Sequence, residues 1–178
     1  MSAGLSMNKT IALIGSSRRD GNTGKLIDLI AGQLGIEVID LALKNISPFD
    51  YDYTNRGDDF LPLMDRLLKY ENIVFASPVY WFAMSAQMKI FIDRMSDLLS
   101  VQALKDQRRA LKSKVGYIVS TSSSEVIDHS FMNSFTDTFE YLGIHYGGFV
   151  HLDCKNGFDV LVAEKAVKHF VNKLNQTV

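Results

Sequence analysis

The sequence has one cysteine, three prolines and no excess of either charge: 178 residues carry 19 Lys+Arg against 20 Asp+Glu. The single cysteine, Cys154, excludes an intrachain disulfide, a zinc site with two cysteine ligands and a four-cysteine iron–sulfur cluster, and it fits the reducing cytoplasm. The balanced charge argues against a nucleic-acid binder that neutralises phosphates. No apolar run approaches the roughly 18 residues that span a bilayer, so no membrane association is expected.

The first seven residues, MSAGLSM, lack the basic start and apolar centre of a signal peptide. We expect residues 1–7 to form a disordered extension. Residues 8–178 contain no linker, internal repeat or low-complexity tract, and their length suits a single domain that buries its own core.

Five continuous apolar runs alternate with segments of helical spacing. Continuous apolar runs are typical of strands buried on both faces. The pattern predicts an α/β fold, a three-layer sandwich around a five-stranded parallel sheet of order 2-1-3-4-5. The predicted strands lie at residues 11–14, 38–39, 73–76, 115–119 and within 144–152, and the helices at 26–34, 60–68, 84–99, 131–142 and 163–174. Residues 42–56 and 101–114 are predicted to be surface connections.

A polar segment, GSSRRDGNTG at residues 15–24, connects the first predicted strand to the first helix. A helix N-terminus offers free backbone N–H groups and partial positive charge, which together suit a phosphate. Ser16, Asn22 and Thr23 can add hydrogen-bond donors, and Arg18 can add a cation. The same segment also suits a simple turn, with Asn22 or Thr23 as a helix cap.

Three well-known phosphate-binding classes do not match this segment. A P-loop needs glycine where Arg19 stands and Ser or Thr where Leu26 stands. A dinucleotide fingerprint needs glycine at Ser17, and a receiver domain needs acidic residues in place of Gly-Ser-Ser.

Three aromatic residues in a row, Tyr80, Trp81 and Phe82, follow the third predicted strand. In a 2-1-3-4-5 sheet the carboxyl ends of strands one and three open onto a ligand-binding crevice. The aromatic residues therefore suit stacking against a flat ligand, with core or subunit packing as the alternative. A third loop, STSSS at residues 120–124, follows the fourth strand, where it could meet the polar edge of a ring or simply cap a helix.

The segments GSSRRDGNTGK and SPVYWFAMSAQMKIFIDR resemble the flavodoxin-like NAD(P)H-dependent FMN reductase family, in its branch with a PVYW-type loop. The resemblance implies a flavodoxin-like fold with bound FMN. The first loop would hold the FMN phosphate, the second would line the isoalloxazine, and the third would meet its pyrimidine side. The residues so implicated are Ser16, Ser17, Arg18, Asn22 and Thr23; Pro78, Val79, Tyr80, Trp81 and Phe82; and Thr121, Ser122 and Ser123.

The resemblance also implies an activity: NADH or NADPH would reduce the flavin, which would then reduce a small acceptor such as a flavin or quinone. Because 178 residues leave no room for a nicotinamide-binding domain, we expect ping-pong kinetics on one flavin face, with no side chain acting as acid or base. The resemblance further implies a homodimer or a dimer of dimers. A flavodoxin-like electron carrier and a non-catalytic flavin-binding module remain alternatives, although such carriers are usually strongly acidic and this chain has net charge -1.

Two kinds of metal site are not expected. Iron–sulfur members of the branch carry a cysteine motif after the second strand, and residues 46–53 contain no cysteine. The four histidines have no spacing that would place two of them on one helix face as ligands. They are His129, His145, His151 and His169.

Overall fold

The computed structural model describes residues 9–176, and five parallel strands form one sheet in the order β2-β1-β3-β4-β5. This confirms the predicted fold class and strand order; the expected extension at residues 1–7 lies outside the described residues. Every residue of β1 and β3 is buried, as expected for strands covered on both faces. The strands are β1 (Thr10–Ile14), β2 (Val38–Asp40), β3 (Asn72–Pro78), β4 (Val115–Ser122) and β5 (His145–Asp153).

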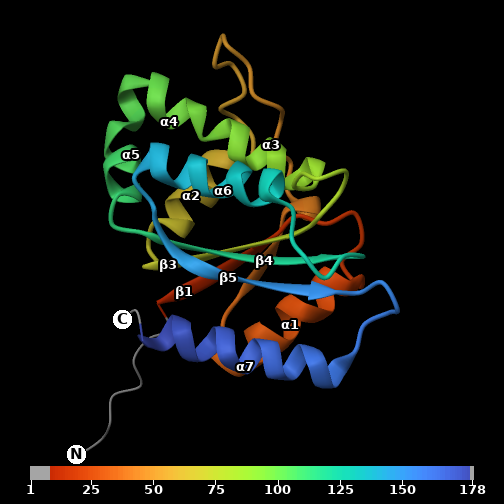
Figure 1. Cartoon of the computed structure of the whole chain (residues 1–178). Coiled ribbons are helices and arrows are strands. Elements are labelled where there is room, and N and C mark those ends of the chain that lie inside the picture. Colours follow the sequence, from red (N-terminus) through yellow and green to blue (C-terminus); the bar gives the residue numbers. More distant parts are fainter. Residues whose placement is uncertain (1–8, 177–178) are drawn as a thin grey trace, which may run out of the picture.

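Helices cover both faces of the sheet (Figure 1). One face packs against α1 (Asn22–Leu34) and α7 (Val160–Gln176), and the other faces the remaining helices. Within residues 9–176 no helix combines the length and apolar character that a membrane crossing requires. The remaining elements are η1 (Leu41–Leu43), α2 (Phe60–Leu67), α3 (Ala86–Arg94), α4 (Ser96–Ser100), η2 (Gln102–Leu104), α5 (Lys105–Leu111) and α6 (His129–Leu142).

Two predictions about local structure are wrong. The single helix predicted at residues 84–99 is two helices, α3 and α4, separated by Met95. The segment 101–114, predicted to be a surface connection, contains η2 and α5, which bury Leu104 and Leu111 in the core. Helices of one or two turns carry too few apolar residues for their periodicity to be visible in the sequence.

The guanidinium of Arg94, at the end of α3, is fully buried and fastens the long connection between η1 and α2. It forms an ion pair with Asp58 and donates to the carbonyl oxygens of Ser47 at 3.1 Å and Asn55 at 2.8 Å. A second buried carboxylate, Asp97, accepts from its Nε at 3.1 Å. The connection is therefore anchored to the helix that follows β3.

Candidate functional site

Three loops meet at the carboxyl ends of neighbouring strands and are joined by buried hydrogen bonds. They are the glycine loop (residues 15–21) after β1, the aromatic loop (residues 78–85) after β3 and the serine loop (residues 121–128) at the end of β4. Ser85 Oγ donates to the carbonyl oxygen of Gly15 at 2.7 Å, and the Val79 N–H donates to the carbonyl oxygen of Thr121 at 3.0 Å. The hydroxyls of Thr23 and Thr121 lie 2.7 Å apart. Each loop is thus bonded, directly or through α1, to the other two.

Ser85 also fixes the far end of the aromatic loop. Its N–H donates to Ser77 Oγ at 2.9 Å, and its own Oγ accepts from the Met88 N–H at 3.2 Å as the N-cap of α3. This residue is not among the predicted site residues, since it lies inside the helix predicted at residues 84–99. A serine three residues before Met88, where the apolar spacing becomes regular, is the N-cap signal that could have found it.

The glycine loop leaves the N-terminus of α1 open. The N-cap is Gly21, which makes no side-chain cap hydrogen bond, and Asn22 and Thr23 are the first residues of the helix. The alternative interpretation of Asn22 or Thr23 as the cap is therefore wrong. Inside the loop, Ser16 Oγ donates to the carbonyl oxygen of Arg18 at 3.0 Å, which holds the chain in a tight curve in front of the helix.

Two adjacent arginines have different surroundings. Arg19 turns along α1 and pairs with Asp28, and this hydrogen bond raises the pKa of the Arg19 guanidinium. Arg18 is exposed and lines a hollow of about 230 Å³ in front of the helix. Arg18 is therefore the cation that a ligand in this hollow would meet.

Backbone packing behind the hollow is close at Gly24. A Cβ atom on Gly24 would lie 1.7 Å from the carbonyl oxygen of Arg19, so no other residue fits without moving the loop. The glycine loop thus owes its shape to a missing side chain as much as to its hydrogen bonds.

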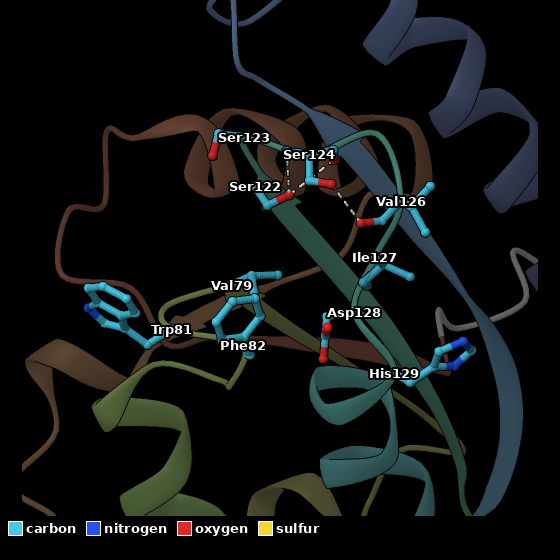
Figure 2. Close-up of a pocket in the computed structure, with 10 residues that line it drawn as sticks. All are labelled: Val79, Trp81, Phe82, Ser122, Ser123, Ser124, Val126, Ile127, Asp128 and His129. Carbon is cyan, nitrogen blue, oxygen red and sulfur yellow. Dashed lines mark hydrogen bonds between the residues drawn. The ribbon is translucent and has the colours of Figure 1, made fainter.

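A second hollow of about 490 Å³ adjoins the first, and Val79, Ser122 and Ser123 line both. Figure 2 shows the serine loop along one side of this larger hollow, with Trp81 and Phe82 reaching it from the aromatic loop. The space is therefore bordered by flat apolar rings from one loop and by hydroxyl and backbone groups from the other.

The aromatic loop turns in a strained conformation. Tyr80 and Ala83 exchange two backbone hydrogen bonds, at 2.9 and 3.0 Å, around a two-residue turn in which Trp81 and Phe82 have φ of 48° and 63°. Such a turn favours Asn-Gly, and each non-glycine residue in this region costs about 1–3 kcal/mol. Trp81 is nevertheless 93% exposed. The fold therefore holds two large apolar rings in solvent at a cost in stability.

The structure brings most of the predicted site residues to these hollows. Ser17 is exposed and lines neither. The smaller hollow is lined by the predicted residues Ser16, Arg18, Asn22, Thr23, Pro78, Val79, Tyr80, Thr121, Ser122 and Ser123, and the larger by Val79, Trp81, Phe82, Ser122 and Ser123. Lining residues that the sequence analysis missed are Gly21 and Cys154 in the smaller hollow and Ser124, Val126, Ile127, Asp128 and His129 in the larger.

The missed residues have different signals in the sequence. Ser124 ends the predicted STSSS segment, and residues 126–129 follow it, so the loop's continuation to the next helix would have indicated them. Cys154 carries no such signal, because it reaches the smaller hollow from the end of β5. Burial raises the pKa of its thiol, and the neighbouring Asp153 adds to the effect. Cys154 is therefore a weak nucleophile in the wall of the hollow.

The two adjoining hollows suit a ligand with an anionic group at one end and a flat ring at the other. Open helix N–H groups, hydroxyls and Arg18 surround the anionic end, and the aromatic loop borders the end that would take the ring. Among residues 9–176 no three His, Cys, Asp or Glu side chains gather in a way that could hold a metal ion.

Comparison with known proteins agrees with this geometry. A family model described as NADPH-dependent FMN reductase matches residues 8–148. The Bacillus subtilis (strain 168) protein named "Putative NAD(P)H-dependent FMN-containing oxidoreductase YwqN" is 26% identical over 167 residues, covering 89% of this chain and 92% of that protein.

Two solved structures share the flavodoxin-like fold. The Trp Repressor Binding Protein from Bacillus subtilis has a TM-score of 0.74 at 23% identity, covering 93% of this chain and 96% of that one. An FMN-dependent NADH-azoreductase from Bacillus anthracis str. Ames Ancestor, solved in complex with FMN, has a TM-score of 0.69 at 12% identity, covering 93% of this chain and 98% of that one.

Proposed function

Since the chain belongs to the NADPH-dependent FMN reductase family, we propose that it is an FMN-dependent oxidoreductase that uses NADH or NADPH to reduce a small acceptor such as a flavin or quinone. The observation that carries this proposal is that the two hollows adjoin, with Val79, Ser122 and Ser123 lining both. A phosphate joined by a flexible chain to a flat ring matches two adjoining hollows.

The smaller hollow would hold the phosphate of FMN. The first N–H groups of α1 are free of a side-chain cap, and a doubly charged phosphate is stabilised by such a helix end. Asn22 and Ser16 add polar groups, while Arg18 adds the positive charge. Thr23 has a further task, because its hydroxyl bonds to Thr121 and holds the serine loop beside α1.

The larger hollow would hold the ring system. Phe82 and Trp81 offer apolar surface for stacking, and the serine loop offers hydroxyl and N–H groups for the polar edge of the ring. When bound, FMN supplies the hydride chemistry, accepting hydride from the nicotinamide and passing it to the acceptor. The protein's part is to bind and orient, and we assign no side chain an acid or base role. Nicotinamide and acceptor would use the same site in turn.

The aromatic loop also favours assembly of two copies. Trp81 and Phe82 are 93% and 61% exposed, and large exposed apolar side chains often mark contact surfaces. We therefore expect a homodimer, or a dimer of dimers, that covers this loop. Light scattering of the purified protein tests the assembly.

The decisive experiment uses purified protein reconstituted with FMN and freed of excess cofactor. We expect a bound-flavin absorbance spectrum that bleaches on anaerobic addition of NADH or NADPH and recovers when a quinone is added. Riboflavin, which lacks the phosphate, serves as the matched ligand and should bind at least tenfold more weakly. Protein that binds FMN but is not reduced by either nicotinamide would support the electron carrier or the non-catalytic module instead. Failure to bind FMN would overturn the proposal.

A further inference from the structure

His151, on the edge strand β5, forms hydrogen bonds at both ends of its ring with residues of β4 and the serine loop. It lies directly opposite Ser120 in the strand pairing, and its Nδ1 is 2.8 Å from Ser120 Oγ. Its Nε2 is 2.9 Å from the carbonyl oxygen of Ser124 and 3.2 Å from Ser122 Oγ. The ring therefore extends from a buried position in the sheet to the tip of the serine loop, which is residues 122–124.

The partners determine which ring nitrogen carries hydrogen. A carbonyl oxygen only accepts, so Nε2 must donate to Ser124. In the neutral ring Nδ1 then accepts the hydroxyl hydrogen of Ser120, whose side chain is completely buried and needs a partner. Both nitrogens are satisfied in one tautomer, and this fixes the direction of the ring.

Among residues 9–176, the tip of the serine loop has few other hydrogen bonds to the sheet. Ser122 and Ser124 bond to each other, with Ser122 Oγ accepting from the Ser124 N–H at 3.0 Å, and such local bonds shape the tip without fixing its place. Directly after β5, the Cys154 N–H donates to the carbonyl oxygen of Ser122 at 2.7 Å. His151 supplies the corresponding link two residues further along, at Ser124.

We propose that His151 is a positioning residue, which holds the serine loop in the place where the loop would contact the flavin ring. The inference rests on the proposed function for the identity of the ligand. His151 lines neither hollow of the candidate site, so it acts through Ser122 and Ser124 and does not touch the ligand.

Three substitutions separate the two hydrogen bonds of the ring. His151→Gln keeps a donor near the position of Nε2 and loses the acceptor for Ser120. His151→Asn keeps an acceptor near Nδ1 and loses the donor to Ser124, while His151→Phe keeps the ring and loses both bonds. His145→Gln, at an exposed position on the same strand, is the control.

Binding of FMN, followed by fluorescence titration, is the first measurement. We expect His151→Gln and His145→Gln to stay within about threefold of the wild-type dissociation constant, and His151→Asn and His151→Phe to bind about tenfold more weakly. If His151→Asn binds like wild type while His151→Gln does not, the histidine only satisfies Ser120 and the proposal is overturned. It is also overturned if all three variants bind like wild type.

The second measurement, amide hydrogen exchange over residues 122–124, needs no flavin. In protein without FMN, exchange should be faster in His151→Asn and His151→Phe than in wild type and His151→Gln, while the core strands exchange as before. Equal exchange at these residues in all four proteins would overturn the proposal. If the four proteins differ in exchange as expected but wild type never binds FMN, the proposed function fails and the role of His151 in positioning the serine loop stands.

Discussion

The hydroxyl of Ser85 donates a hydrogen bond to the carbonyl oxygen of Gly15 at 2.7 Å, with the Ser85 side chain completely buried. This bond joins the end of the aromatic loop to the start of the glycine loop. The same oxygen caps α3 by accepting from the Met88 N–H. One serine thus fixes the relative position of the two loops that would hold opposite ends of the ligand.

Replacing this serine should affect both stability and ligand binding. Ser85→Ala removes an N-cap and leaves a buried carbonyl without its partner, so the free energy of unfolding should fall by about 1–3 kcal/mol in urea titrations. FMN affinity should fall by about tenfold, because the loops lose their common anchor. Ser130→Ala, at an exposed position on α6, is the control and should leave both quantities unchanged.

The two adjacent arginines of the glycine loop provide a matched pair. Arg18→Ala should weaken FMN binding by about tenfold or more, because a hydrogen bond to a charged group contributes about 1.5–3 kcal/mol. Riboflavin affinity should not change, since riboflavin has no phosphate. Arg19→Ala breaks an exposed ion pair with Asp28 and should leave FMN affinity within about threefold. Equal effects of the two substitutions in fluorescence titrations would contradict the assignment of Arg18.

Relaxing the strained turn should stabilise the protein and harm the site. The double substitution Trp81→Asn and Phe82→Gly introduces the residues that the turn prefers. The free energy of unfolding, measured in urea titrations, should therefore rise by about 1–3 kcal/mol. The same variant loses both rings and should bind FMN at least tenfold more weakly. Tyr141→Asn, which removes another exposed aromatic ring from α6, should show neither effect. A loss of stability in the double variant would argue against the strain.

Cys154 reports on occupancy of the smaller hollow. Burial raises the pKa of its thiol, with a contribution from Asp153, so at pH 8 less thiolate is present than in an ordinary cysteine. Alkylation should therefore be slower than for a free thiol and should speed up at more alkaline pH. Saturating FMN should slow the reaction further, measured by mass spectrometry at several times, whereas riboflavin should protect less. Identical rates with and without FMN would place the cofactor elsewhere.

The buried ion pair of Asp58 and Arg94 should make the free energy of unfolding depend on pH. Burial acts to raise the pKa of the Asp58 carboxyl, but hydrogen bonds from Arg94 and from the backbone N–H groups of Ser47 and Phe60 lower it overall. Because the folded-state pKa is lowered, this stabilisation is complete above the ordinary carboxyl range near pH 4 and is lost as the pH falls through the folded-state value.

The Asp58→Asn variant tests this dependence. The substitution removes one of the two carboxylates that pair with the buried Arg94 and leaves Asp97 as its partner, so the variant should lose about 1–3 kcal/mol of unfolding free energy at pH 7. The difference from wild type should shrink in urea titrations carried out below pH 4. A difference that does not change with pH would mean that the carboxylate charge has no part in the anchor.

The layers and strand order were predictable because they follow from local patterns. Buried strands such as β3 appear as continuous apolar runs, and α1, α6 and α7 are long enough to show helical spacing. The short helices α4 and α5 were not predictable in this way. The presence of a polar loop after β1 and an aromatic loop after β3 was likewise visible, since both directly follow apolar runs.

The sequence by itself determined the sheet, its helical layers and which loops reach the ligand-binding edge, because periodicity and chain order are local properties. Only the tertiary structure decided how those loops are held. The hydrogen bonds between Ser85 and Gly15, between Thr23 and Thr121, and between His151 and Ser124 join residues distant in sequence, and no local pattern specifies them. The sequence named Arg18 rather than Arg19 as the phosphate-binding cation, and the structure adds a physical reason, because Asp28 lies one helical turn beyond Gly24 and pairs with Arg19.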